Sequence, residues 1–242
     1  MNKTKFNEGV IIRHANPAPQ TIDQSFFIRE DVELARLLYR HVVLNRSQLL
    51  EHLFLLKSRI GATRLIKLTK YGFVNRYEML NEQNKLCDRF YTISPRSAEL
   101  LSVPDPVRLS ADVIKRLLAT NYFILSCLTC QGNIEYELTA RSPVSAYIYR
   151  DNVYSIYAPR DEASAEETIA HINEKQPTRA LIIAPTSELA IQIDKRILVP
   201  ARYAFDKDIV ELTLKFYSVD RGSNLCPAHI NLTKPKLKGG VL

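Results

Sequence analysis

The chain has 242 residues, 46% of them hydrophobic, which is enough for the core of one large domain or two small ones. Its longest apolar runs fall well short of the ~20 residues that a membrane-spanning helix requires, and its first residues lack the apolar core of a secretory signal. We therefore expect a cytoplasmic protein that has no membrane partner.

The net charge of +7 is concentrated in two parts of the chain. Residues 29–96 contain thirteen Lys and Arg against seven Asp and Glu, and the tail after residue 222 adds three lysines. Residues 103–222 instead contain fourteen basic and sixteen acidic residues. One region thus suits a polyanionic partner and the other does not. The alternative is a basic face that only contacts solvent.

Helical patterns are expected after a loosely attached N-terminal arm. Residues 1–28 show no sustained hydrophobic period and include two prolines in residues 16–19, so we predict a flexible arm there. A first helix should begin near Arg29, because acidic residues occupy its first turn and basic residues its last. A second helix should begin at Asn45 or Ser47, either of which can act as its N-cap.

The third helical pattern is the most basic one. It should run over residues 59–70 with Ser58 as its N-cap, and Gly72 should take the left-handed conformation that releases the chain into a strand. Helical periodicity predicts that its apolar residues point inward, namely Ile60, Leu65, Ile66 and Leu68. It predicts that three basic residues point outward, namely Arg64, Lys67 and Lys70. An outward basic face on this helix indicates contact with a polyanion.

A β-hairpin is expected after the third helix. Residues 73–80 and 86–93 are strand-like and flank a turn at 81–85, and Ser94-Pro95 opens another helix. Three helices followed by a hairpin is the order of a winged helix-turn-helix, which we predict for residues 29–102. Its third helix would enter the major groove of double-stranded DNA, with the hairpin as the wing. The candidate DNA-binding residues are Ser58, Arg59, Thr63, Arg64, Lys67, Lys70, Arg76, Lys85 and Arg89.

Motifs in the same region also resemble those of a known family. Leu44 to Leu49 reads as a leucine, polar residues, a glutamine and a leucine. Arg64 to Phe73 follows the pattern RL-x-x-L-x-x-x-G-hydrophobic, and Tyr91 to Pro95 follows Y-x-(L/I)-(T/S)-P. These motifs resemble the winged-helix part of replication-relaxation proteins, which plasmids and integrative elements encode, largely in Gram-positive bacteria. One departure is Ser97, where the family usually has a glycine.

The resemblance implies a role as well as a fold. It implies a DNA-binding protein that acts with a replication initiator or a relaxase, in replication or conjugative transfer, or that controls transcription of the genes concerned. The motif pattern is shared with many winged-helix transcription regulators, so it points to a DNA-binding module more directly than to one biological role.

The alternation of helix and strand patterns in the second half of the chain predicts an α/β domain. The whole protein is therefore expected to be α/β (α+β). A long helix over residues 107–130 leads into this domain, which we place at residues 103–222, before a basic tail at 223–242. The following elements have a β-β-α-β-α-β order: strands 146–149 and 153–157, helix 162–175, strand 179–184, helix 187–197 and strand 208–217. In replication-relaxation proteins the corresponding domain resembles restriction endonucleases, which implies the same fold here.

The second domain lacks the residue pattern of a nuclease. Such an enzyme needs carboxylates that hold Mg²⁺ and a nearby lysine, typically as Glu-x-Lys on a strand. The strand that should carry this motif has no acidic residue, and Asp206, Asp208, Glu211 and Lys215 have the residue types without the spacing. We therefore predict an inactive domain, no catalytic residue and no enzyme. Two alternatives stay open: a Mg²⁺-dependent nuclease accessory protein, and a winged helix that binds protein.

Cys127, Cys130, Cys226 and His229 raise the question of a zinc site. Both pairs have the two-residue gap of zinc ligands, but the pairs lie far apart in the sequence and the first one ends an apolar helix. Packing in the core is the preferred interpretation, so we expect neither a metal nor another cofactor. Because regulators of this kind are commonly symmetric, we also expect a homodimer.

Overall fold

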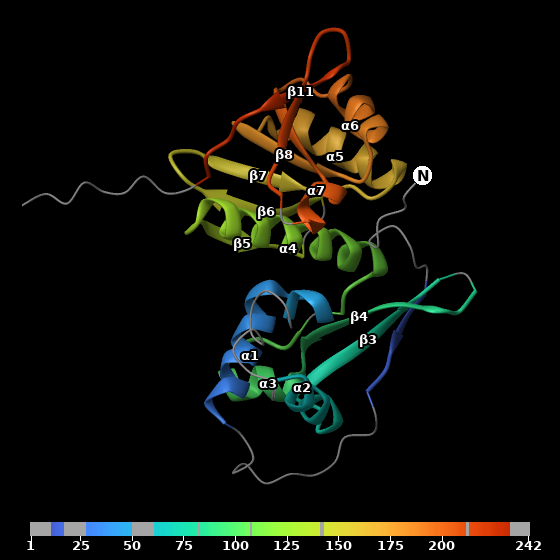
Figure 1. Cartoon of the computed structure of the whole chain (residues 1–242), viewed down its shortest axis with the longest axis vertical. Coiled ribbons are helices and arrows are strands. Elements are labelled where there is room, and N and C mark those ends of the chain that lie inside the picture. Colours follow the sequence, from blue (N-terminus) through green and yellow to red (C-terminus); the bar gives the residue numbers. More distant parts are fainter. Residues whose placement is uncertain are drawn as a thin grey trace, which may run out of the picture. The chain divides into compact units, whose positions relative to one another are not determined.

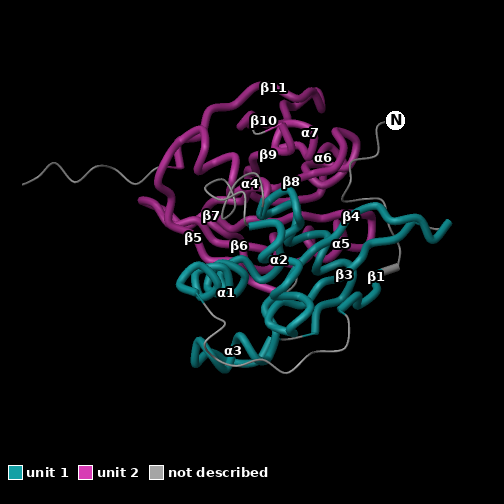
Figure 2. Tube along the Cα trace, turned by 60° about the horizontal axis from the view of Figure 1, so that its bottom comes forward, with its two compact units in different colours: residues 1–121 teal, residues 122–242 magenta. Residues whose placement is uncertain are grey.

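The computed structural model describes residues 11–16, 28–49, 61–81, 83–106, 108–140, 143–211 and 213–232. These residues form a mixed α/β protein with helices and two sheets (Figure 1). The chain divides into two compact units, which we call unit 1 (residues 1–121) and unit 2 (residues 122–242) (Figure 2). The boundary lies inside helix α4 (Ala111–Gln131), later in the chain than the predicted boundary after residue 102.

Unit 1 combines helices with a four-stranded sheet. Its elements in chain order are β1 (Ile11–His14), α1 (Arg29–His41), β2 (Leu44–Asn45), α2 (Gly61–Lys70), β3 (Val74–Leu80), β4 (Leu86–Ile93), α3 (Pro95–Leu101) and the start of α4. The strand order is β1-β3-β4-β2, and all neighbouring strands are antiparallel. Buried residues of the helices and strands share one core, among them Leu34, Leu38, Leu65, Tyr91 and Ala98.

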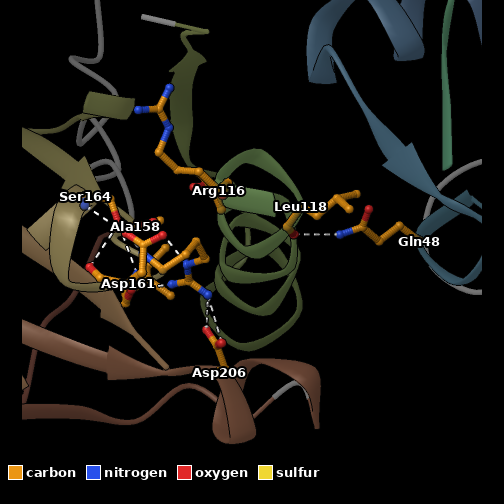
Figure 3. A network of polar contacts seen from close by, with 10 residues as sticks. Gln48, Arg116, Leu118, Ala158, Asp161, Ser164 and Asp206 are labelled. Carbon is orange, nitrogen blue, oxygen red and sulfur yellow. Dashed lines mark hydrogen bonds and ion pairs between the residues drawn. The ribbon is translucent and has the colours of Figure 1, made fainter. Parts of the chain in front are cut away.

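The first part of α4 belongs to unit 1 because it completes the hydrogen bonding there. The side-chain amide of Gln48 donates to the carbonyl of Leu118 at 3.0 Å (Figure 3). The side-chain amide of Asn121 donates to the carbonyls of His41 and Val43 at 3.1 and 2.6 Å. These side chains are buried, so this part of α4 is core structure and not a linker.

The predicted hairpin and the ends of its neighbouring helices are confirmed. β3 and β4 pair along their length. The Ser94 hydroxyl caps α3 by accepting a hydrogen bond from the backbone nitrogen of Ser97 at 3.2 Å. Gly72 has a φ of 72°, and the backbone nitrogen of Phe73 donates to the carbonyl of Leu68 at 2.9 Å. This left-handed residue therefore ends α2 as expected.

Strand β1 corrects the prediction of a flexible arm over residues 1–28. β1 pairs with β3, with Ile11 opposite Leu80. Ile11 and Ile12 are β-branched residues, a type that favours an extended backbone. A strand of four residues is too short to show a period of two, which explains why the pattern was missed. Most of the remaining arm lies outside the described residues.

The second predicted helix and the start of the third fall largely outside the described residues. Residues 46–49 are helical and follow β2 directly, and residues 50–60 are not described. α2 is described from Gly61 onward. The candidate contact residues Ser58 and Arg59 therefore lie outside the described part of the chain.

Unit 2 combines the rest of α4 with a seven-stranded mixed sheet. Its further elements are β5 (Glu135–Leu138), β6 (Val144–Tyr149), β7 (Val153–Tyr157), α5 (Glu162–Lys175), β8 (Arg179–Ala184), α6 (Ser187–Asp194), β9 (Ala201–Phe205), α7 (Asp206–Val210), β10 (Phe216–Val219) and β11 (Leu225–Ala228). The strand order is β11-β10-β9-β8-β7-β6-β5. β7, β8 and β9 are parallel, and the other neighbouring pairs are antiparallel. The predicted hairpin, helix, strand and helix between β6 and α6 are confirmed.

The end of unit 2 differs from the prediction. Residues 208–217 were expected to form one strand, but they contain the end of α7, a turn and the start of β10. Acidic residues suit the first turn of a helix, and the backbone nitrogen of Thr213 closes the turn by donating to the carbonyl of Asp208 at 2.9 Å. The short strands β5 and β9 were not predicted. β11 occupies part of the expected basic tail.

Helix α4 is, among the described residues, the one helix long and apolar enough to cross a membrane. Most of its apolar stretch is buried inside the protein. Core helices of water-soluble proteins meet the same criterion, so the length and composition of α4 are weak evidence for a membrane span.

Candidate nucleic-acid interface

The solvent-facing side of α2 is the strongest candidate surface in unit 1. Thr63, Ile66, Lys67 and Lys70 are all exposed, and their spacing of three or four residues places them on one side of the helix. The helix contains no acidic residue. We call these four residues the α2 face. It offers a hydroxyl, an apolar side chain and two ammonium groups along about two helical turns.

The position of Ile66 corrects the predicted division of this helix. Ile66 was expected to point inward, but 64% of its surface is exposed. The inward side is formed by Leu65, Leu68 and Thr69, which are buried. Since successive residues are rotated by about 100° around a helix, Ile66 cannot lie on the same narrow stripe as these three residues. The isoleucine is therefore part of the surface that α2 presents to solvent.

The C-terminal end of α2 is held by Arg96 of α3. The guanidinium of Arg96 lies 4.3 Å from the centre of the Phe73 ring, and its Nη1 donates to the carbonyl of Tyr71 at 3.4 Å. A cation at this position also suits the negative end of the helix dipole. The α2 face is therefore carried by a helix whose buried side and end are both fixed.

Arg64 does not point outward as predicted. Its Nε donates to Oδ1 of Asp31 on α1 at 2.8 Å, and a second hydrogen bond joins its Nη2 to Oδ2 of the same carboxylate. The hydrogen bond to Asp31 raises the pKa of Arg64 above its ordinary value. Helical periodicity alone predicted that Arg64 points outward. The carboxylate of Asp31 on α1 holds its guanidinium between the two helices. Arg64 thus links two helices.

Lys67 and Lys70 are the basic residues that α2 leaves exposed. Neither forms a salt bridge with another residue that the structure describes. Lys70 Nζ lies 6.0 Å from the centre of the Tyr71 ring, within reach of a weak cation–π contact. Within the part of the chain that the structure describes, both ammonium groups can therefore approach an anion without first leaving a carboxylate.

The three candidate residues of the hairpin differ in how they are engaged. Lys85 is exposed beside the turn. Arg89 is half-buried and its Nε lies 3.3 Å from a carboxylate oxygen of Glu78. Arg76 donates from Nη2 to the carbonyl of Ala15 at 2.8 Å, so it holds the chain after β1. Of the three, Lys85 is the one that the structure leaves most accessible.

Arg13 is a basic residue of this surface that sequence reasoning missed. It lies on β1 with 63% of its side chain exposed, and its Nη2 lies 2.6 Å from Glu78. The Arg13 guanidinium holds the pKa of the Glu78 carboxyl below its usual range, with a further contribution from Arg89. The Ile11-Ile12 pair directly before Arg13 was the signal that could have revealed a strand.

Two of the three acidic residues considered for a nuclease are engaged in structural contacts, and the third, Glu211, is exposed. Asp206 is fully buried, and both of its carboxylate oxygens accept hydrogen bonds from Nη1 of Arg160, at 2.9 and 2.8 Å (Figure 3). Asp208 is also buried, with Lys215 Nζ at 3.3 Å. The described residues contain no group of three or more His, Cys, Asp and Glu that could hold a metal ion.

The four residues considered for zinc do not form such a group. Cys127 is buried in α4, where burial raises the pKa of its thiol, whereas Cys130 on the same helix is exposed. Cys226 on β11 lies near Asp220, with 3.9 Å between its Sγ and a carboxylate oxygen, and His229 is exposed. The prediction that these cysteines pack in the core thus holds for Cys127 but not for Cys130.

Comparison of the chain with family models, curated proteins and solved structures found no match. The resemblance to replication-relaxation proteins therefore rests on the sequence motifs alone. Within those motifs, Leu65 and Phe73 are buried, Gly72 has a positive φ and Ser94 caps a helix. These motif residues thus serve mainly to build unit 1. The evidence for a function of the α2 face lies in its own exposed side chains.

Proposed function

We propose that unit 1 is a winged helix-turn-helix and that the protein binds double-stranded DNA through the α2 face. The observation that carries this proposal is the set of four exposed side chains, Thr63, Ile66, Lys67 and Lys70, on a helix without acidic residues. The major groove of B-DNA admits an α-helix. There, a threonine can bond base edges, an apolar side chain can contact the methyl group of thymine, and lysines can contact guanine or phosphate.

The connections of the sheet support the winged-helix assignment. β2 follows α1 and pairs with β4, so the hairpin is joined to the helical part by a third strand. The chain enters β3 directly from the end of α2, through Gly72. In this arrangement α2 is the recognition helix and the β3-β4 hairpin, with Lys85 beside its turn, is the wing.

We extend the proposal to the biological role through the motif resemblance. The protein would act on DNA of a plasmid or mobile element, in replication or conjugative transfer or in transcriptional control, in the cytoplasm and as a homodimer. A replication initiator or a relaxase is the partner protein that the resemblance implies. Unit 2 would be an inactive α/β domain of the restriction-endonuclease type. The mixed sheet, with α5 and α6 connecting its parallel strands, supports that part of the proposal.

The test is to select a duplex from a random pool with the full-length protein and then to measure its affinity by fluorescence anisotropy at several salt concentrations. Lys67→Ala/Lys70→Ala should weaken binding and lower the slope of log affinity against log salt by about one for each lost phosphate contact. Lys175→Ala/Lys195→Ala removes two exposed positive charges from unit 2 and is the matched control. Equal effects of both double variants would contradict the assignment to the α2 face.

Two alternative functions give different results in the same set of measurements. A winged helix that binds only protein would show no affinity for any duplex, even at low salt. A nuclease accessory protein would cleave plasmid DNA when incubated with Mg²⁺ or Mn²⁺. Lys67 and Lys70 would not by themselves account for this cleavage. Binding without cleavage is the result that we expect.

A further inference from the structure

A groove in unit 1 lies between α2 and the β1-β3 pair. Ile66 and Lys70 line it from α2, and Arg13, Arg76 and Glu78 line it from the strands. Ile66 and Lys70 also belong to the α2 face, so the groove continues that face toward the edge of the sheet. A duplex that lies along α2 would therefore present its backbone to this groove.

The charges in and beside the groove come from four elements, namely α2, β1, β3 and β4. A row of three charged residues crosses the sheet, because Arg13 on β1 and Arg89 on β4 are both opposite Glu78 on β3. Their nitrogens lie 2.6 and 3.3 Å from the carboxylate oxygens of Glu78. The two arginines thus carry more positive charge than the one negative charge of Glu78. Lys70 and Arg76 add to this positive excess. The groove is cationic despite its one carboxylate.

The segment that carries Arg13 is firmly attached to the sheet. After β1, the backbone nitrogen of Ala15 donates to the carbonyl of Arg76 at 2.8 Å, and Arg76 Nη2 donates to the carbonyl of Ala15 at 2.8 Å. The side chain of Asn16 accepts from the backbone nitrogen of Arg76 at 2.6 Å and donates to the carbonyl of Val74 at 2.9 Å. These bonds fix the backbone on the C-terminal side of Arg13, so its guanidinium is presented from a strand and not from a loose arm.

We propose that this groove holds a phosphate of the DNA backbone and that Arg13 is a DNA-contacting residue supplied by β1. The inference rests on the proposed function of the α2 face. A guanidinium presents a planar set of donors that fits two oxygens of one phosphate, and such charge-assisted bonds are among the stronger ones in proteins. Arg13 is 63% exposed and can turn part of its donor set toward a phosphate while Arg89 continues to neutralise Glu78.

The simplest competing explanation is that Arg13 only attaches β1 to the sheet through Glu78. The salt dependence of DNA binding separates the two roles, because a structural residue changes stability without removing a phosphate contact. The variant Arg13→Gln should lower the slope of log affinity against log salt by about 0.9, whereas Arg13→Lys should retain most of the slope. Arg29→Gln, which removes an 88% exposed cation from α1, is the matched control and should leave the slope unchanged.

A second variant tests the carboxylate of the groove. Glu78→Gln removes the negative charge nearest to the proposed phosphate, so affinity for a duplex of any sequence should rise by about fivefold at low salt. Circular dichroism melting of each variant verifies that unit 1 is folded. Affinity that falls in Glu78→Gln, with the fold intact, would contradict a phosphate at this position.

The outcomes distinguish this inference from the proposed function. If Lys67→Ala/Lys70→Ala weakens binding but Arg13→Gln keeps the wild-type slope, the phosphate site is wrong and DNA binding by the α2 face stands. If Arg13→Gln and Arg29→Gln lower the slope equally, Arg13 acts only through the overall charge and the site is wrong. If the wild-type protein binds no duplex at low salt, both proposals are overturned.

Discussion

The guanidinium of Arg64 on α2 and the carboxylate of Asp31 on α1 form a two-hydrogen-bond ion pair, with 2.8 Å between Nε and Oδ1. Only 14% of the Arg64 side chain and 2% of the Asp31 side chain are exposed. The same carboxylate accepts a hydrogen bond at 3.0 Å from the backbone nitrogen of Ile28 at the start of α1. Asp31 thus joins the first turn of α1 to α2. Arg64 positions the helix that carries the proposed DNA contacts, and most of its own side chain is buried.

Removing Arg64 should destabilise unit 1. We expect Arg64→Ala to lower the free energy of unfolding by about 3 kcal/mol, because it leaves the buried carboxylate of Asp31 without its cation. Urea unfolding of the full chain, followed by circular dichroism, measures this change. Lys67→Ala is the matched control on the same helix and should change stability by less than about 0.5 kcal/mol, since Lys67 is exposed. Wild-type stability of Arg64→Ala, combined with loss of DNA binding, would restore Arg64 as a direct contact.

Arg64 also shows where inference from sequence reaches its limit. The hairpin, α5 and β8 were predictable because each is encoded by a local pattern, and Gly72 marked the end of α2 by its conformational freedom. The orientation of Arg64 depends on Asp31, which lies 33 residues earlier in the chain. Helical periodicity contains no information about such a partner, so the outward direction was the natural prediction and was wrong.

Short strands were missed for a related reason. β1 and β5 have four residues each, and β9 has five, so their alternation is too brief to stand out from a loop. What makes them strands is a neighbour that supplies the other half of the hydrogen bonds, as β3 does for β1. The Ile11-Ile12 pair hinted at a strand, but the proposed contribution of Arg13 to the candidate interface depends on that pairing.

Because of His41, we expect the folded protein to lose stability in mildly acidic solution. It is buried at the end of α1, and its Nδ1 lies 2.8 Å from Oδ1 of Asn121. Burial lowers the pKa of His41 from 6.5 to about 4. Between these two values the unfolded chain binds a proton that the folded chain does not, so this contribution to stability is complete above about pH 6.5 and falls as the pH decreases toward 4. The full loss is on the order of 3 kcal/mol.

The measurement is urea unfolding at a series of pH values for the wild type and for His41→Gln. The variant should show a weaker dependence on pH between about 6.5 and 4, because the other titrating groups are common to both proteins. Parallel pH profiles for the two proteins would mean that His41 is protonated as readily in the folded chain as in the unfolded one.

Asn121 should be among the most sensitive positions of α4. Its amide group donates to the carbonyls of His41 and Val43 and its oxygen faces the ring of His41, so it supports a turn in which Val42 has a φ of 63°. A β-branched residue in that conformation is strained, and it persists only where its surroundings hold it. Asn121→Ala removes the side-chain hydrogen bonds to the buried carbonyls of His41 and Val43 and should cost about 3 kcal/mol of unfolding free energy.

Thr129→Ala is a suitable control for Asn121→Ala, because Thr129 is exposed on the same helix. Its effect on the free energy of unfolding should stay within about 0.5 kcal/mol. Thermal unfolding of both variants in the full chain is sufficient to compare them. Equal midpoints for the two variants would show that the hydrogen bonds of Asn121 add nothing to the stability of unit 1.

We expect the ion pair of Arg160 and Asp206 to stabilise unit 2, and the variants that test this also test the nuclease alternative. Arg160 donates to both oxygens of Asp206 and to the carbonyls of Ala158 and Ile183, at 3.0 and 2.5 Å for the two carbonyls. Arg160→Met should cost about 4 kcal/mol, because a buried carboxylate loses its cation. Arg160→Met/Asp206→Leu should recover much of that loss, since replacing both members of a buried pair by apolar side chains is often tolerated.

The same variants show whether Asp206 has any part in metal binding. Because both carboxylate oxygens already accept hydrogen bonds from Arg160, millimolar Mg²⁺ should leave the unfolding midpoint of the wild-type protein unchanged. A midpoint that rises with Mg²⁺ in the wild type but not in Asp206→Asn would identify the carboxylate as a metal ligand. That result would favour the nuclease accessory function, because a ligated metal is what its chemistry requires. An unchanged midpoint together with the recovery in the double variant would instead assign the pair to the stability of unit 2.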